Sequence, residues 1–113
     1  MRAVIGSMAL TLVLVLTAPI VPETVDVDRV GHVDLESFTC SDTPRSTAIQ
    51  RVCYAPSQQS LLVSLHGTYR AHCELPPGIY RAFVVAPSMG RFYGRAIGDN
   101  PAFRCPAARQ FPR

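Results

Sequence analysis

The chain has 113 residues, with 11 arginines, no lysine and 8 acidic residues, which gives a formal net charge of +3. This length allows one domain and excludes a multidomain enzyme. Once an apolar N-terminal stretch is set aside, a globular part of about 70–90 residues remains, and its core supplies only ~3–5 kcal/mol without covalent help. The charge is uneven, because residues 23–42 carry a balance of −5 and residues 43–113 a balance of +7.

Residues 1–22 are predicted to be an export signal or an N-terminal membrane anchor. Arg2 precedes a long apolar run that breaks at Pro19 and Pro22, and the favoured cleavage site follows Ala18. About 18 apolar residues suffice to cross a bilayer, so a retained anchor is the alternative, with a buried helix as a third reading. We expect a secreted or periplasmic protein, or one that is membrane-anchored with its domain outside the cytoplasm.

Residues 23–42 are predicted to be an acidic linker. Valines alternate with acids from Glu23 to Glu36, and this density of charge favours a solvated segment that docks only near its end. Residues 33–38 have apolar positions with a period of two, which indicates a weak edge strand leading to Cys40.

Residues 43–105 form the predicted domain, and its first half has the pattern of three strands. Residues 46–54, 61–65 and 68–74 are rich in apolar, β-branched and aromatic side chains and are joined by short turns, which predicts an antiparallel meander. In the third strand we expect Tyr69, Ala71 and Cys73 to face the helices that follow.

The hydrophobic period then changes to about 3.6. Pro76 and Pro77 can open a helix over residues 78–85. Ser88 is a good N-cap for a second helix with an apolar stripe from Met89 to Ile97, and Gly98 stands where a C-terminal cap belongs. We expect an α+β fold: a three-stranded antiparallel meander, with room for an extra edge strand, followed by two short helices packed on one face. Residues 103–105 suggest one more short strand, and residues 106–113 a frayed C-terminal tail.

The four cysteines indicate two disulfides. None lies in a C-x-x-C pair, which argues against a zinc ribbon or a thioredoxin-like redox pair, and an even count suits an exported chain. Of the three pairings we favour Cys40–Cys53 with Cys73–Cys105, because Cys105 follows the helices that we expect over Cys73 and the N-terminal segment can cross Cys53. In the loop-closure model each bridge contributes roughly 3–4 kcal/mol.

Four segments in this order resemble the KTSC domain, a module named for its occurrence at the C-terminus of some lysyl-tRNA synthetases. The segments are Ser46–Tyr54, Leu61–Tyr69, Leu75–Tyr80 and Ala86–Ile97. The most specific residues are Pro76, Tyr80, Ser88, Gly90, Phe92 and Tyr93. The resemblance implies an α+β fold and a suggested role in RNA binding. The sequence departs from the family at Ala71, where a second tyrosine is usual, and at Pro87.

The expected function is that of a non-catalytic interaction or structural module in the cell envelope, with an unidentified protein or envelope component as its partner. The alternative is binding of RNA, of another nucleic acid or of an anionic ligand, in which arginines hold phosphates and aromatic rings offer stacking surfaces. Membrane contact is expected only if residues 1–22 are retained. The candidate binding residues are Arg70, Arg81, Arg91, Arg95, Tyr69 and Tyr93.

We expect no enzymatic activity, no catalytic residue, no cofactor and no metal site. His72 and Cys73 are neighbours on a predicted strand and so point to opposite faces, which excludes a nucleophile–base pair. His66 and His72 could both be exposed, but two imidazoles without a third ligand make a weak metal site. After Asp42 the chain has only two acids, too few for paired acid–base chemistry.

Overall fold

The computed structural model describes residues 6, 11–13, 21–107 and 109–111. Nearly all of the predicted export signal or anchor, residues 1–22, lies outside these ranges and stays a prediction. Among the described residues, no helix is both long enough and apolar enough to cross a membrane. In chain order, the elements are β1 (Thr24–Val27), β2 (Gly31–Asp34), β3 (Thr39–Asp42), β4 (Ile49–Ala55), β5 (Ser60–Leu65), β6 (Thr68–His72), α1 (Pro77–Val84), α2 (Met89–Phe92), the π-helix η1 (Tyr93–Gly98) and the 3-10 helix η2 (Pro101–Phe103).

Six strands form one sheet, in the order β2-β1-β6-β5-β4-β3. β1 joins β6 in parallel, through the bridge between Val27 and Tyr69, and the other neighbours pair antiparallel. The predicted three-stranded antiparallel meander is therefore wrong, because β4, β5 and β6 are only the centre of a larger mixed sheet. The predicted acidic linker, residues 23–42, supplies the other three strands.

The acidic segment can form strands because its burial is one-sided. Val27 and Val33 are buried, whereas Asp26 and His32, which face each other across β1 and β2, are exposed. The charges thus stay in water while the valines leave it, and burial of two β-branched side chains offsets the low strand propensity of the acids. The density of charge suggested a solvated linker, but the alternation of valine and acid was the stronger signal.

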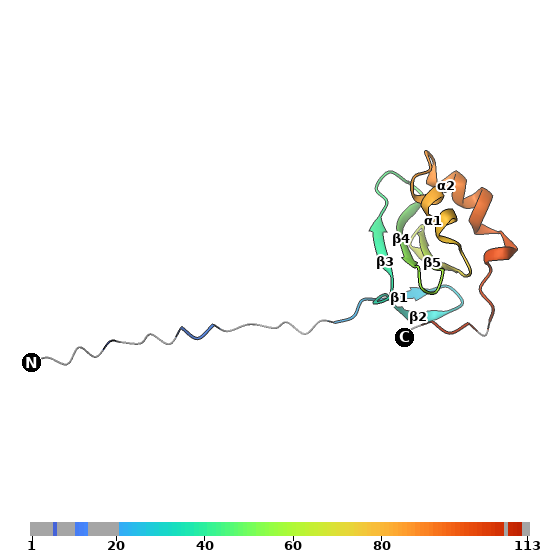
Figure 1. Cartoon of the computed structure of the whole chain (residues 1–113). Coiled ribbons are helices and arrows are strands. Elements are labelled where there is room, and N and C mark those ends of the chain that lie inside the picture. Colours follow the sequence, from blue (N-terminus) through green and yellow to red (C-terminus); the bar gives the residue numbers. More distant parts are fainter. Residues whose placement is uncertain (1–5, 7–10, 14–20, 108, 112–113) are drawn as a thin grey trace, which may run out of the picture.

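The sheet is rolled so that its edges approach each other. β2 and β3 are its opposite edges, yet only residues 35–38 connect them. In a flat sheet of this order the two edges would lie about 24 Å apart, whereas the chain from Asp34 to Thr39 reaches at most about 18 Å. The connection is also folded into a turn, in which the Phe38 amide donates to the Leu35 carbonyl. In Figure 1, β3 accordingly begins at the end of the molecule where β1 and β2 lie.

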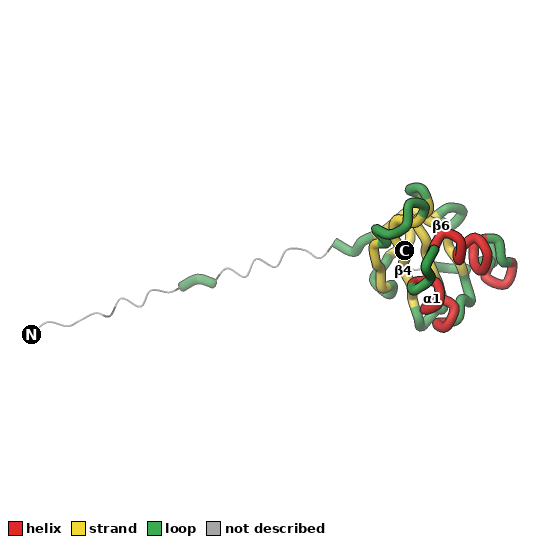
Figure 2. Tube along the Cα trace, turned by 90° about the horizontal axis from the view of Figure 1, so that it is seen from above, coloured by secondary structure: helices red, strands yellow, loops and turns green. Residues whose placement is uncertain are grey.

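Both faces of the central strands are buried. The outer face packs against the helices, which gather on one side of the strands in Figure 2. This helix-side core comprises Ile49, Val52, Tyr54, Leu61, Val63, Leu75, Phe83, Met89, Tyr93 and Ile97. The inner face of the roll holds the strand-side core, which comprises Val27, Val33, Leu35, Phe38, Cys53, Ala55, Leu62, Cys73 and Phe111.

The two faces of β6 are the reverse of the prediction. Tyr69, Ala71 and Cys73 belong to the strand-side core, and His72 lies under the helices against Tyr93. Because both faces of this strand are covered, the alternation of polar and apolar residues does not reveal which face the helices occupy. His72 is 4% exposed, so the expectation that it is solvent-accessible is also wrong.

α1 begins and packs as its sequence indicates. Pro76 is its N-cap and Pro77 its first residue, and it buries Phe83. Tyr80 lies flat against Tyr54, with ring centroids 4.3 Å apart, and the Tyr54 hydroxyl donates to the Leu75 carbonyl at 2.7 Å. The proline turn and its tyrosine are therefore parts of the helix-side core.

The second predicted helix is divided into α2 and η1. The Ser88 side chain accepts from the Arg91 amide, as expected of an N-cap, but after Phe92 the chain widens into a π-helix that ends at Gly98 and has Asp99 as its C-cap. Gly98 lies inside η1 and is not the predicted C-terminal cap. A Cβ at this position would stand 3.1 Å from Cε1 of Tyr93, so glycine lets the tyrosine ring lie close to the backbone.

The C-terminal segment is bound to the sheet. Residues 103–105, predicted to be a short strand, are instead the end of η2 and an extended stretch, in which the Phe103 carbonyl accepts from the Cys73 amide at 2.9 Å. Both disulfides have the favoured pairing, Cys40–Cys53 and Cys73–Cys105. Phe111, predicted to lie in a frayed tail, is buried in the strand-side core.

Candidate functional site

Four exposed arginines lie on the helix side of the sheet, and we call them the arginine surface: Arg70 on β6, Arg81 on α1, Arg91 on α2 and Arg95 on η1. In the described part of the chain, the ion pairs with carboxylates are made by Arg51 and His32, and none of these four arginines takes part in one. Their positive charge is therefore available to a partner.

The arginine surface has two parts. Arg91 and Arg95 are four residues apart on the continuous α2–η1 segment, a spacing that places two side chains on one face of a helix. Arg70 lies close enough to His72 and Tyr93, beneath the same segment, for its charge to act on both. Burial and then this charge lower the pKa of His72, whereas burial raises the pKa of Tyr93 and the charge only partly opposes it. Arg81 is on the other helix, where its charge acts on Tyr54.

The two candidate tyrosines are not brought together. Tyr93 is 5% exposed and lies in the helix-side core, where its hydroxyl and Nε2 of His72 are 2.8 Å apart. Tyr69 is half-buried and packs against the strand-side core, on the other face of the sheet. The structure therefore separates Tyr69 from the arginine surface and leaves neither tyrosine as an open stacking platform.

The His72–Tyr93 pair is neutral at physiological pH. Burial, followed by the nearby positive charge of Arg70, lowers the pKa of His72 to about 4, while Asp99 acts in the opposite direction. Burial also raises the pKa of Tyr93. Two uncharged groups joined by a hydrogen bond can be held in a core at little cost. The histidine acts here as a packing residue and is closed to solvent.

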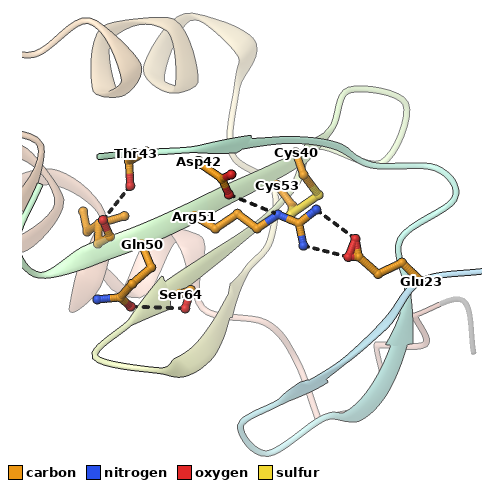
Figure 3. Close-up of polar contacts among 9 residues, drawn as sticks. Glu23, Cys40, Asp42, Thr43, Gln50, Arg51, Cys53 and Ser64 are labelled. Carbon is orange, nitrogen blue, oxygen red and sulfur yellow. Dashed lines mark hydrogen bonds and ion pairs between the residues drawn. A yellow bond between two sulfur atoms is a disulfide. The ribbon is translucent and has the colours of Figure 1, made fainter. Parts of the chain in front are cut away.

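A polar cluster around Arg51 was not foreseen from the sequence (Figure 3). Both terminal nitrogens of Arg51 donate to the carboxylate of Glu23 at 2.8 Å, and Asp42 lies 3.9 Å from Nε. The hydrogen bond from Arg51 lowers the pKa of Glu23. The pKa of Arg51 is raised, first by its hydrogen bond to Glu23 and second by a hydrogen bond to Tyr69. Because the two partners are 28 residues apart, no local pattern could have indicated the pair.

The Glu23–Arg51 pair ties the start of β1 to β4 and helps to close the roll of the sheet. Beside it lies an open depression of ≈ 680 Å³, lined by Val21, Pro22, Glu23, Leu35, Glu36, Phe38, Cys40 and Arg51. A second depression of ≈ 600 Å³ borders the β1–β2 turn, between Asp26 and Gly31, and the β5–β6 turn at Gly67 and Thr68. Among the described residues no group of three or more histidines, cysteines or acids could hold a metal ion.

A family model for the KTSC domain matches residues 45–100. The structure is also similar to the crystal structure of a KTSC domain protein from Yersinia pestis, with a TM-score of 0.53 and 20% sequence identity over 56% of this chain and 89% of that one. At this identity the second likeness concerns the fold alone. No curated protein matches the chain. The matched residues contain β4, β5, β6, both α-helices and η1, and thus all four residues of the arginine surface.

Proposed function

Because residues 45–100 of this chain form a KTSC domain whose helix layer carries unpaired arginines, we propose that the protein is an exported, non-catalytic interaction module that binds an anionic partner in the cell envelope. The observation that carries the proposal is the charge of the arginine surface, whose four arginines are exposed and take part in no ion pair among the described residues. The part of the chain that supplies them, residues 43–113, contains two acids, Glu74 and Asp99, against nine arginines, one of which, Arg51, is paired with Glu23. A cationic surface of this kind attracts acidic groups and speeds encounter with them.

The two disulfides favour a location outside the cytoplasm. Such bonds form and persist in oxidising compartments. Each bridge has one buried cysteine, Cys53 in one and Cys73 in the other, and a small domain gains much stability from cross-links. Residues 21–23, which the structure describes, lead into β1 on the side away from the helices (Figures 1 and 2).

The charge of the same surface also suits nucleic acid, but the aromatic residues favour the first proposal. Proteins that bind single strands combine cationic grooves with exposed rings on which bases stack. Here Tyr93 is buried, Phe92 is half-buried against Phe83, and Tyr80 is stacked on Tyr54. A nucleic acid would therefore be held by phosphate contacts alone. Arginine forms forked hydrogen bonds with carboxylates equally well, so an acidic protein or polymer fits the surface without any ring.

The test compares polyanions of different chemistry on the chain beginning at Pro19. Poly-L-glutamate, single-stranded RNA and single-stranded DNA are titrated at several salt concentrations. We expect poly-L-glutamate to bind at low salt, and RNA and DNA to bind no tighter than ~100 μM, the weak end of non-specific binding. RNA binding much tighter than poly-L-glutamate binding would favour the nucleic-acid alternative. No binding of any polyanion would contradict both.

Single-charge variants locate the surface. Arg91→Ala and Arg95→Ala should each weaken polyanion binding severalfold, because each removes a contact on the helix side. Arg29→Asn is the matched control, since it removes one exposed arginine from the β1–β2 turn and asparagine tolerates the positive φ of 64° found there. An equal loss in all three variants would mean that only net charge matters and that the helix side is not the site.

A further inference from the structure

The inner face of the rolled sheet is covered by parts of the chain outside the family match. Within the matched region, Cys53, Ala55 and Leu62 present the apolar floor of this face. Its cover comes from β1, β2 and the turn at residues 35–38 on one side and from Phe111 on the other. Each disulfide joins a cysteine of the matched region to one outside it. The KTSC domain of this chain therefore has a second apolar face, and the chain's own extensions occupy it.

The last part of that cover, residues 106–111, is held by side chains. Nη2 of Arg109 donates to the Gln58 carbonyl at 3.1 Å and to the Ser60 hydroxyl at 3.0 Å. Phe111 is 8% exposed, and the guanidinium of Arg109 lies 5.8 Å from the centre of its ring. Among the described residues of this segment, the backbone hydrogen bond is a local one, from the Arg109 amide to the Pro106 carbonyl.

This pattern of contacts is that of a bound peptide with two anchors. Ser60 is fully buried, so its hydroxyl and the neighbouring carbonyl form a fixed acceptor pair for a guanidinium. The adjoining apolar pocket accepts an aromatic ring two residues later in the chain. Arginine and aromatic anchors in desolvated pockets carry most of the affinity at protein interfaces. Residues 109–111 contact the sheet through side chains and not through backbone hydrogen bonds among the described residues. A separate peptide with the same side chains can therefore make the same contacts.

The charge around the groove favours a basic peptide. β1, β2 and the residues next to them carry Asp26, Asp28, Asp34 and Glu36, besides the Glu23 that pairs with Arg51, and Phe111 shares the strand-side core with Val27 and Val33 of these strands. Complementary charge of this kind selects partners and raises the rate of encounter more than the affinity. The inner face thus differs from the arginine surface, because its buried residues are apolar and the exposed residues around it are acidic.

We propose that the inner face is a groove for an extended peptide of a partner protein, with an arginine two residues before an aromatic residue, and that residues 106–111 occupy it as an internal competitor. Cys105 holds the segment next to the groove, which gives Phe111 an effective concentration on the order of millimolar. A partner therefore displaces the segment only if it makes contacts beyond the two anchors.

The test supplies the segment as a separate peptide that spans residues 106–113. The receptor is the chain carrying Phe111→Ala, in which the occupying segment has lost one of its two anchors. We expect this variant to bind the peptide at least tenfold tighter than the unaltered chain does. In the peptide, the Phe111→Ala and Arg109→Ala changes should each weaken binding at least tenfold. Gln110→Ala is the matched peptide control and should leave binding unchanged, because Gln110 is exposed between the anchors.

Several outcomes overturn the proposal. One is that the Phe111→Ala chain binds the peptide no tighter than the unaltered chain does, and another is that the anchor changes in the peptide have no effect. If the Phe111→Ala chain is unfolded, peptide added at millimolar concentration should restore its thermal transition, and failure to do so also overturns the proposal. A concentration-dependent dimer that Phe111→Ala abolishes would assign the groove to the segment of a second copy, against a partner protein.

Discussion

His72 is buried as a neutral side chain, and the structure makes this dependent on pH. Burial, and after it the charge of Arg70, lowers its pKa to about 4, whereas the imidazole titrates near 6.5 in an unfolded chain. Between pH 6.5 and pH 4, His72 is protonated in the unfolded state but stays neutral in the folded state. The contribution of His72 to stability is therefore fully present above pH ~6.5 and is lost as the pH falls toward 4.

The prediction for His72 is a loss of up to about 3 kcal/mol of folding free energy between pH 6.5 and 4. His72→Gln keeps a hydrogen-bonding group near Tyr93 but has no proton to gain, so it should flatten this part of the profile. His66→Asn is the control, because His66 is exposed in the β5–β6 turn. Urea unfolding at several pH values measures the effect. An unchanged slope in His72→Gln would contradict the account.

Gly98 offers a second test at the scale of a residue. A methyl group there would stand 3.1 Å from Cε1 of Tyr93, whereas a methyl group at Gly94, in the same π-helix, would meet no atom within 4 Å. We expect Gly98→Ala to cost about 1–3 kcal/mol through overpacking, and Gly94→Ala to be neutral or stabilising by up to ~1 kcal/mol. Thermal unfolding of the two variants gives the comparison, and equal effects would show that η1 adjusts freely.

The disulfides act at the scale of elements. Cys40 and Cys53 face each other on β3 and β4, which are already paired, and their bridge closes a separation of 13 residues. Cys73–Cys105 closes a separation of 32 residues and attaches the C-terminal segment to the end of β6. In the loop-closure model each bridge contributes roughly 3–4 kcal/mol to the free energy of unfolding, and Cys73–Cys105 contributes about 0.8 kcal/mol more than Cys40–Cys53 because it closes the longer loop.

Removing each bridge separately should distinguish these roles. We expect Cys73→Ala with Cys105→Ala to lower the unfolding free energy by roughly 3–4 kcal/mol and to raise hydrogen exchange at Leu62 in the strand-side core. Cys40→Ala with Cys53→Ala should loosen the edge strand β3 first. Exchange measured by mass spectrometry reports both effects. If the first pair of changes left exchange in the strand-side core unaltered, the C-terminal segment would not depend on the bridge.

The elements also show where sequence reasoning succeeded and where it failed. The positions of β4, β5 and α1 follow from local patterns: runs of apolar residues, short turns and the prolines before Gly78. β1 and β2 were missed because the density of charge outweighed the alternation of valine and acid, and the bridge that joins β1 to β6 lies between residues 42 positions apart, which no local pattern reports. The faces of β6 were reversed because both are covered. The exposure of the four arginines and the packing of the two tyrosines could be predicted, but not that Tyr69, half-buried, and Tyr93, buried, would lie on opposite faces of the sheet.

At the scale of the whole molecule, charge is divided between two ends. Unpaired arginines lie on the helix side, and most acids lie on β1, β2, β3 and the residues that join them. The Glu23–Arg51 pair joins one of these acids to β4 and helps to close the sheet there (Figure 3). The proposals use this division: an anionic partner on the helix side and a basic peptide on the inner face.

The most direct measurement is the salt dependence of poly-L-glutamate binding by the chain beginning at Pro19, compared with the variant carrying both Arg91→Ala and Arg95→Ala. If arginine–carboxylate contacts carry the binding, affinity falls as salt rises, and the double variant shows weaker binding with a shallower dependence on the logarithm of salt concentration. The unaltered chain should lose at least tenfold in affinity between low and physiological salt. Identical salt dependence in the two proteins, or no binding at low salt, would contradict the central claim that this surface receives an anionic partner.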